Sequence, residues 1–333
     1  MRPRIVIVGA GMGGLAAAID LARRGAAVTL LERAAAPGGK MRRVQVGEAG
    51  IDGGPTVFTM RWVFEGLLRD AGTRLEDELQ LAAADILARH AWREGGRLDL
   101  HADIDRSAEA IAQFAGPAEA DGYRRFCARS RQIYQTLERP FIDGQRPSPL
   151  GLTNRVGFTR LDRLLALRPW QAMWPALGQF FRDPRLRQLF GRYATYCGSS
   201  PLSAPATLML VAHVEQDGVW LVRGGMHEVA QALARVAVRH GAELRYDAHV
   251  RAVTLDGGKV SGVELDSGDL QVRAKSYKLE KVSLAYEDLI ENPAALAAQI
   301  STLGPVKAAT PRLYASGIIA SAVFRICGLT PTR

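Results

Sequence analysis

The chain has 333 residues, of which 47% are hydrophobic and 23% are charged. This composition excludes a disordered or fibrous protein and leaves room for a full core in about two domains. The net charge of +9 comes from 43 Lys and Arg against 34 Asp and Glu, with arginines spread along the chain. Such spreading argues against a nucleic-acid-binding stripe, so no nucleic-acid partner is expected, and it agrees with a surface that meets anionic lipid.

Cysteine and histidine usage limits the possible metal and disulfide chemistry. Cys127, Cys197 and Cys327 lack C-x-x-C spacing, and the six histidines lack ligand spacing. We therefore expect no disulfide framework and no metal site, and a reducing cytoplasm is the expected compartment. We expect no signal peptide, and no apolar run approaches the ~18 residues that span a bilayer. Any membrane contact is therefore expected to be peripheral.

The first predicted elements form a βαβ unit. Ile5–Val8 predicts a short buried strand, which leads into glycines at positions 9, 11 and 14. Ala16–Arg24 predicts a helix with Gly25 as its stop, and Ala27–Leu31 predicts a second strand.

The glycines follow the pattern G-x-G-x-x-G, which is typical of dinucleotide binding. Gly9 would allow the tight turn, Gly11 would let backbone approach a pyrophosphate at the helix N-terminus, and Gly14 would let helix and strand pack closely. Glu32 ends the second strand, 18 residues after Gly14 (32 − 14), near the spacing for contact with ribose hydroxyls. An acid there favours FAD or NAD over NADP. A glycine-rich turn without a ligand is the weaker alternative.

Two further glycine-rich stretches follow. Pro37–Arg43 presents free backbone N–H groups beside three cations, and it suits either the far side of a pyrophosphate or a plain surface turn. Ile51–Val57 interrupts a strand-like region with two glycines and a proline. This pattern brings backbone close to a flat ligand or makes a tight turn.

The later elements include an apolar segment and a βα pattern. Leu164–Phe181, with two tryptophans and flanking arginines, predicts either an interfacial segment or a buried helix pair. Met226–Arg239 predicts an amphipathic helix, with His227 at its start. Asp256–Lys259 predicts a hairpin turn into the strand Val260–Leu265.

The motifs up to residue 57, in this order, resemble the flavin-binding part of the bacterial phytoene desaturase family of FAD-dependent carotenoid oxidoreductases. Asp183–Phe190 and Tyr193–Pro205 resemble signatures of that family, and Gly218–Met226 resembles its G-V-W-x-x-x-G-G-M element. Within the family, the chain looks most like the hydroxyneurosporene (methoxyneurosporene) desaturases of purple photosynthetic bacteria. Three stretches carry this closer similarity: Thr56–Glu65, Phe126–Tyr134 and Ala206–Asp217.

The resemblance implies an α/β fold with a Rossmann-like FAD-binding domain and a second, helix-rich substrate domain. Residues 1–63 and 212–268 would form the first, and residues 64–211 would form the substrate and membrane-contact domain. Residues 269–333 do not match the family, either as a divergent ending or because the reading frame changes near Gly268. Whether they complete the flavin site is left open.

The implied function is desaturation of an acyclic (hydroxy)carotenoid such as 1-hydroxyneurosporene, with transfer of a hydride from the carotenoid to FAD. A protein with such a lipophilic substrate is expected in the cytoplasm, attached peripherally to the inner or intracytoplasmic membrane. Two alternatives stay open, another flavin oxidase resembling the amine oxidases, and an inactive form that binds an isoprenoid.

The resemblance also implies site residues. Val250 matches the family's strand position beside the adenine. No catalytic residue is assigned, although aromatic faces and carboxylates could stabilise a cation: Trp170, Trp174, Phe180, Tyr193, Tyr196, Glu215 and Asp217 are candidates, unless the aromatics are core and the acids are surface. The expected cofactor-binding residues are Gly9, Gly11, Gly13, Gly14, Glu32, Arg33, Gly39, Lys40, Gly53, Gly54, Pro55, Thr56 and Val250.

Overall fold

The computed structural model describes residues 4–138, 142, 167, 170–256 and 259–268. These residues divide into two compact units. One contains the described residues up to Leu81 and those from Leu221 to Gly268, and the other is Ala82–Trp220. Both unit boundaries lie further along the chain than the predicted domain boundaries after residues 63 and 211.

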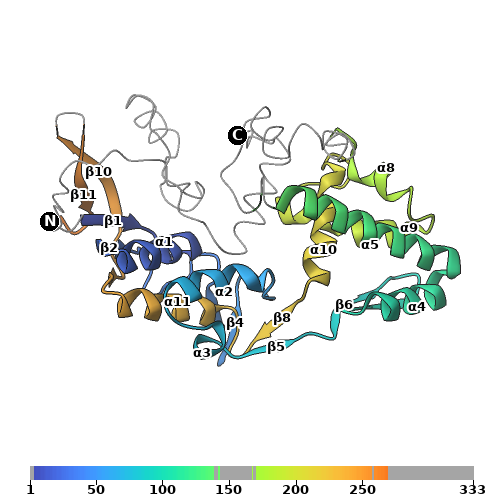
Figure 1. The fold of residues 1–333 in the computed structure, drawn as a ribbon, viewed down its shortest axis with the longest axis horizontal. Helices are drawn as coiled ribbons and strands as arrows, with labels where there is room; N and C mark the ends of the chain where they lie inside the picture. Colours follow the sequence, from blue (N-terminus) through green and yellow to red (C-terminus); the bar gives the residue numbers. More distant parts are fainter. Residues whose placement is uncertain (1–3, 139–141, 143–166, 168–169, 257–258, 269–333) are drawn as a thin grey trace. The chain divides into compact units, whose positions relative to one another are not determined.

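A three-stranded parallel sheet organises the first unit (Figure 1). β1 (Arg4–Val8) pairs with β2 (Ala27–Leu31), and β2 pairs with β9 (Glu243–Arg245). α1 (Met12–Arg23) connects β1 to β2, as the sequence predicts. The helix begins earlier than predicted, because Gly11 has extended backbone angles and is itself the N-cap.

Helices and a hairpin cover the sheet. α1 packs against α11 (His227–Arg239), and both helices contact the sheet. β10 (Val250–Asp256) pairs antiparallel with β11 (Lys259–Leu265). Asp256 at the end of β10 pairs with Lys259 at the start of β11, which confirms the predicted hairpin. The side chains that pack this hairpin onto β1 and β2 are apolar: Val6, Val8, Leu31, Val250, Val263 and Leu265. Apolar side chains of β1, β2, β10 and β11 therefore form one core cluster.

Shorter elements complete the first unit. β3 (Arg43–Val46) and β4 (Ala49–Asp52) form an antiparallel hairpin, and α2 (Arg61–Asp70) and α3 (Leu75–Glu78) follow it. α2 contacts α1 and α3. β5 (Leu81–Ala83) and β8 (Trp220–Val222), which contain the boundary residues of the two units, form a two-stranded sheet.

The second unit is rich in helices, as predicted. The packing of α4 (Ile104–Ala115) against α5 (Pro117–Leu137), and of α5 against α10 (Leu210–Gln216), forms its framework. Phe126, Phe181 and Phe190 fill the centre, each within 5.5 Å of the other two by ring centroid. Its elements are β6 (Ile86–Ala91), β7 (Arg97–His101), α4 (Ile104–Ala115), α5 (Pro117–Leu137), α8 (Met173–Leu177), α9 (Pro184–Gly191), α10 (Leu210–Gln216) and the 3-10 helices η3 (Arg192–Cys197) and η4 (Ala206–Met209).

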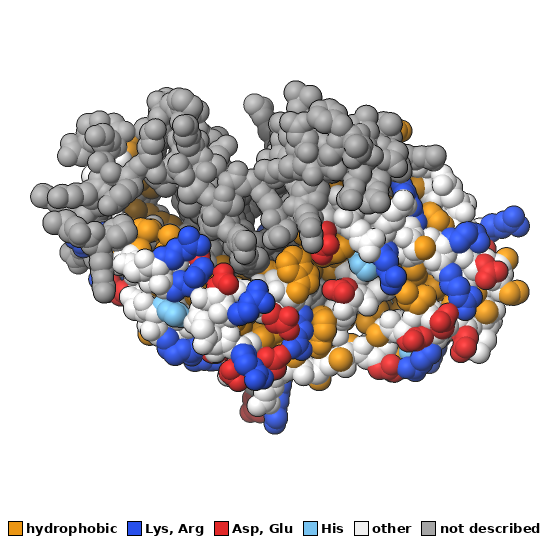
Figure 2. Space-filling model, viewed as in Figure 1, with side chains coloured by type: hydrophobic (Ala, Val, Ile, Leu, Met, Phe, Trp, Pro, Cys, Tyr) orange, Lys and Arg blue, Asp and Glu red, His pale blue; other side chains and the backbone are white. Residues whose placement is uncertain are grey.

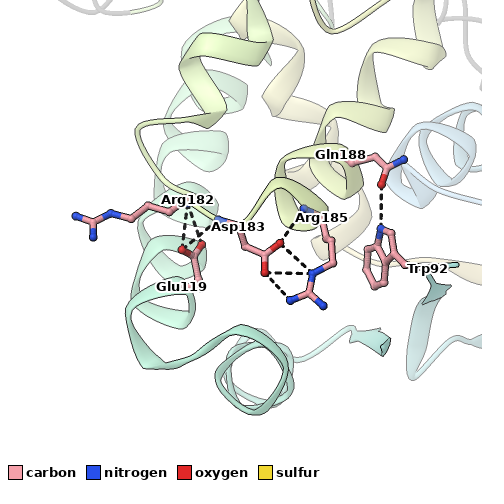
Figure 3. Close-up of polar contacts among 6 residues, drawn as sticks. All are labelled: Trp92, Glu119, Arg182, Asp183, Arg185 and Gln188. Carbon is pink, nitrogen blue, oxygen red and sulfur yellow. Dashed lines mark hydrogen bonds and ion pairs between the residues drawn. The ribbon is translucent and has the colours of Figure 1, made fainter. Parts of the chain in front are cut away.

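The signature that begins at Asp183 is a helix start (Figure 3). Asp183 is the N-cap of α9, and its Oδ1 accepts a hydrogen bond of 2.8 Å from the backbone N–H of Arg185. The guanidinium of Arg185 also binds this carboxylate, and it lowers the pKa of Asp183. Glu119, from α5, accepts hydrogen bonds from the backbone N–H groups of Arg182 and Asp183. Two carboxylates therefore fix the place where α9 begins.

The apolar segment Leu164–Phe181 is described only in part, at Leu167 and at residues 170–181. Its described part contains one short helix, α8, whose Met173 and Leu177 are buried, whereas Trp170 is 72% exposed. In the described part of the chain, no helix has both the length and the apolar character needed to cross a bilayer. Figure 2 shows basic and acidic side chains interspersed on the face that it draws.

Replacing Asp183 tests the helix-start interpretation. We expect Asp183→Ala to lower the free energy of unfolding by about 1 kcal/mol, because it removes the cap of α9. Since Arg185 lowers the pKa of Asp183, the cap stabilises the fold at neutral pH, and its contribution disappears as the pH falls through that lowered pKa. Urea denaturation at neutral and acidic pH measures both effects. Asp121→Ala, at a carboxylate that is 68% exposed on α5, is the matched control and should change little.

Candidate cofactor site

The glycine turn between β1 and α1 contains one glycine that packing requires and one that it does not. A Cβ at Gly14 would lie 1.9 Å from the carbonyl oxygen of Gly9, so helix and strand approach closely only because position 14 has no side chain. Gly9 itself has a φ of 95°, which glycine adopts readily. A Cβ at Gly11 would meet no atom of the chain within 4 Å. The open space at Gly11, at the N-terminus of α1, fits a pyrophosphate.

The second glycine-rich loop closes on this turn. The backbone N–H of Gly38 donates a hydrogen bond of 2.8 Å to the carbonyl oxygen of Ala10, and Gly38 forms a parallel bridge with Gly11. A Cβ at Gly39 would lie 3.3 Å from the Cα of Gly11. Of the two interpretations that the sequence allows for Pro37–Arg43, this placement favours a loop that faces a pyrophosphate at the glycine turn.

The third glycine-rich loop packs on the second. The N–H of Gly53 donates a hydrogen bond of 2.8 Å to the carbonyl oxygen of Arg42. A Cβ at Gly54 would lie 1.9 Å from the carbonyl oxygen of Lys40. Three glycine-rich stretches that are separate in the sequence therefore contact one another in series, the second on the glycine turn and the third on the second.

Glu32 is buried beside these loops. Its Oε2 accepts a hydrogen bond of 2.6 Å from the N–H of Ala10, and its Oε1 accepts one of 2.9 Å from the N–H of Ala34. Each carboxylate oxygen keeps further acceptor capacity, which a ribose hydroxyl could use. Burial, and then the charge of Glu32, raise the pKa of the nearby Tyr246. Glu32 therefore also orients the glycine turn, a role that its spacing alone did not indicate.

Asp52 is a site residue that the sequence did not reveal. Both of its carboxylate oxygens accept hydrogen bonds from the N–H of Met226, at 3.0 and 2.9 Å. A Cβ at Gly225 would lie 2.9 Å from the same carboxylate, so this glycine makes room for it. The Gly-Gly-Met turn is thereby joined to the third loop. The sequence did contain a signal for this contact. Asp52 precedes two glycines, Met226 directly precedes a predicted helix, and anionic groups favour helix N-termini.

The remaining expected cofactor contacts lie at the edges of this region. Gly13 is in the first turn of α1, and His227 begins α11 as predicted, with its Nδ1 2.9 Å from the carbonyl oxygen of Met41. Val250 packs against the apolar cluster formed by Leu31, Val263 and Leu265, and Leu31 directly precedes Glu32 in the chain. The side chains that reach outward from the loops are exposed or half-buried: Arg33, Lys40, Pro55 and Thr56.

The candidate residues for catalysis fall in the second unit, where the structure brings three of them together. Glu215 is buried and accepts hydrogen bonds from the hydroxyl groups of Tyr193 and Tyr196. The expectation that the acids lie at the surface is therefore wrong for Glu215, whereas Asp217 is exposed. Trp170 is exposed, and Trp174 and Phe180 are half-buried.

A parallel βαβ sheet, whose first turn meets a second glycine-rich loop and a buried glutamate, defines a dinucleotide-binding α/β protein. Residues 12–277 match the sequence profile of flavin-containing amine oxidoreductases, and the chain belongs to this family. A putrescine oxidase structure has a TM-score of 0.52 at 17% identity, covering 80% of this chain and 56% of that chain. A Pyrococcus furiosus protein has a TM-score of 0.52 at 16% identity, covering 91% and 66%. The predicted fold class is confirmed.

Several curated relatives are carotenoid enzymes. Hydroxyneurosporene desaturase of Rubrivivax gelatinosus is 51% identical over 267 residues, which cover 80% of this chain and 51% of the relative. The enzyme of the same name from Cereibacter sphaeroides is 45% identical, covering 80% and 54%. Phytoene dehydrogenase of Streptomyces griseus is 37% identical, covering 79% and 51%. The predicted resemblance is confirmed, and the chain spans about half the length of the curated relatives it matches.

Two alanine substitutions separate ligand binding from packing. We expect Gly11→Ala to fold with nearly unchanged stability but to lose flavin affinity by at least about tenfold, because the new methyl group enters space that the chain leaves open. We expect Gly14→Ala to destabilise the fold by about 2 kcal/mol or more, because its methyl group meets the carbonyl of Gly9. Thermal unfolding and flavin titration of both variants test this difference. Unchanged flavin affinity in Gly11→Ala would contradict the placement of the pyrophosphate.

Proposed function

We propose that the first unit binds FAD and that the protein acts as a carotenoid desaturase, which introduces a C–C double bond into an acyclic hydroxycarotenoid. The observation that carries the proposal is the contact of the second glycine-rich loop and Glu32 with the glycine turn at the N-terminus of α1. It occurs in a chain that is 51% identical to a hydroxyneurosporene desaturase over 80% of its residues.

Different residues of the first unit would bind different parts of the cofactor. Gly11 and the free N–H groups of α1 would hold the pyrophosphate, with Gly39 and Lys40 on its far side. Glu32 would accept hydrogen bonds from ribose hydroxyls, and Val250 would lie beside the adenine. Bound FAD supplies the acceptor for the hydride that leaves the carotenoid.

The second unit would hold the lipophilic substrate. A carotenoid polyene offers apolar and π surface, and Trp174, Phe180 and Tyr196 are half-buried aromatic side chains of this unit that could contact such a ligand. The chain spans about half the length of the relatives it matches, so flavin and carotenoid binding are assigned to the present residues and turnover is tested separately.

Peripheral membrane contact is the route that we propose for substrate access. Trp170 is 72% exposed and Leu202 is 68% exposed, on segments that hydrogen bond to each other through Met173 and Ala204 and through Trp174 and Pro201. Tryptophan is enriched at membrane interfaces, where an apolar ring meets the headgroups. The net charge of +9 favours an anionic surface. Trp170 and Leu202 would insert between the lipids.

The function is tested first by flavin and then by turnover. We expect the purified 333-residue chain, supplied with FAD, to show a stoichiometric oxidised-flavin spectrum. We expect the loaded protein to lengthen the conjugated system of 1-hydroxyneurosporene in liposomes, which absorbance spectra and chromatography would detect. Gly11→Ala is the control that should weaken both signals, because it lowers flavin affinity. Folded protein that takes up no FAD would overturn the proposal as a whole, and flavin without any desaturation would overturn the activity alone.

Membrane contact is tested by sedimentation with vesicles of phosphatidylcholine and phosphatidylglycerol. We expect the double variant Trp170→Ala/Leu202→Ser to reduce the partition constant by about tenfold or more, because it removes two large apolar side chains from the bilayer. Leu221→Ser, at an apolar side chain that is 53% exposed, is the matched control and should bind as the wild type does. Equal binding by the double variant and the control would rule out this surface.

A further inference from the structure

The three parallel strands of the first unit end at one edge of the sheet, and the residues that follow them differ in chemistry. β1, β2 and β9 are neighbours in this order. The glycine turn follows β1, Glu32 follows β2 and Tyr246 follows β9. Ligands of parallel α/β sheets bind outside the carboxyl ends of the strands. Tyr246 is therefore the next side chain along this edge after the glycine turn and the carboxylate.

Backbone hydrogen bonds fix Tyr246 beside Glu32. The N–H of Glu32 donates to the carbonyl oxygen of Arg245, and the N–H of Ala248 donates to the carbonyl oxygen of Glu32, both at 2.8 Å. Tyr246 thus lies between two residues that both bond to the main chain of Glu32. Burial, and then the charge of the Glu32 carboxylate, raise the pKa of the Tyr246 phenol, so the two side chains are also near each other.

The turn after Tyr246 is held in a conformation that few residues adopt. Asp247 has a φ of 52°, in the left-handed region that is uncommon for residues other than glycine. Its N–H donates a hydrogen bond of 3.1 Å to the carbonyl oxygen of Ala34, two residues after Glu32. This bond ties the turn to the chain that leaves β2. The backbone of Tyr246 is therefore held on both sides.

The side chain of Tyr246 has a face that the described residues do not use. It is half-buried, and within the described ranges its phenol forms no hydrogen bond and its ring meets no other ring and no cation. An aromatic ring of this kind packs well against another flat π system. Nucleobases are such systems, and each of them offers a π face to an aromatic side chain.

The order of the strands predicts which part of FAD would reach Tyr246. The pyrophosphate is assigned to the glycine turn after β1, and the ribose is assigned to Glu32 after β2. The adenine is attached to that ribose, and neighbouring strands lie about 4.8 Å apart. One further step along the edge of the sheet, from β2 to β9, therefore leads from the ribose to the base.

We propose that Tyr246 is a contact residue for the adenine of FAD, whose base packs on the tyrosine ring, and that this contact favours FAD over a flavin without adenosine. The inference rests on the proposed binding of FAD by the first unit. Val250 would lie beside the same base. The ring of Tyr246 carries the contact, and its hydroxyl group is not required for it.

Two flavins test the proposal without requiring turnover. FAD and FMN share the flavin ring and its ribityl phosphate, and only FAD carries adenosine. The flavin-free 333-residue chain is dialysed to equilibrium against each of them. We expect Tyr246→Leu to lower FAD affinity by about tenfold, the effect of one lost stacking contact with a base. FMN affinity should change by less than about twofold. Tyr246→Phe keeps the ring and should bind both flavins as the wild type does.

A fragment of the cofactor gives a second measurement. ADP carries the adenosine and the pyrophosphate without the flavin, so it should compete with FAD for the wild type. We expect ADP to bind Tyr246→Leu about tenfold more weakly than it binds the wild type, for the same reason as FAD. Val253→Ala, at an exposed side chain of β10 in the same unit, is the control and should leave all three affinities unchanged.

The outcomes separate this inference from the function on which it rests. A purely structural role for Tyr246 would weaken FAD and FMN by the same factor and lower the melting temperature of the flavin-free chain. Equal losses for both flavins, or unchanged FAD and ADP affinities in folded Tyr246→Leu, overturn the proposal. A loss in Tyr246→Phe as large as that in Tyr246→Leu overturns it as well. A folded wild type that takes up no FAD contradicts the proposed function itself, and with it this inference.

Discussion

The close approach of α1 to β1 is the constraint on which the first unit depends. The carbonyl oxygen of Gly9 occupies the place where a side chain at position 14 would stand, so the helix starts directly at the end of the strand. This arrangement points the unpaired N–H groups of the first helical turn at the open space beside Gly11. A bulkier residue at position 14 would move the helix away and separate these donors from the glycine turn.

The other loops of the site extend the same principle, since backbone packs directly on backbone wherever glycine permits. Gly38 bonds to Ala10, Gly54 lies against the carbonyl of Lys40, and Gly225 leaves room for the carboxylate of Asp52. These contacts leave few side chains between the loops, so the region can present main-chain donors to an anionic ligand. Glu32 adds a buried negative charge whose two oxygens are already oriented by backbone N–H groups.

The second unit combines two kinds of polar arrangement in an apolar, aromatic interior. Carboxylates at the start of α9 satisfy backbone donors and serve the fold. The cluster at Glu215 instead gathers a guanidinium and two phenols, whose side-chain donors hold its carboxylate. Buried carboxylates of this unit are therefore satisfied either by backbone N–H groups or by side-chain donors.

The sequence by itself determined the βαβ unit, the identity of the glycines, the hairpin before β11 and the family, because these features depend on local patterns and fixed spacings. Only the tertiary structure decided that Asp52 meets Met226, 174 residues away, and that Glu215 is buried with Tyr193 and Tyr196. Periodicity predicts which face of an element is apolar, but it does not say which distant polar group will satisfy a helix start or a buried carboxylate. Those pairings follow from packing, which brings the elements together before any hydrogen bond between them can form.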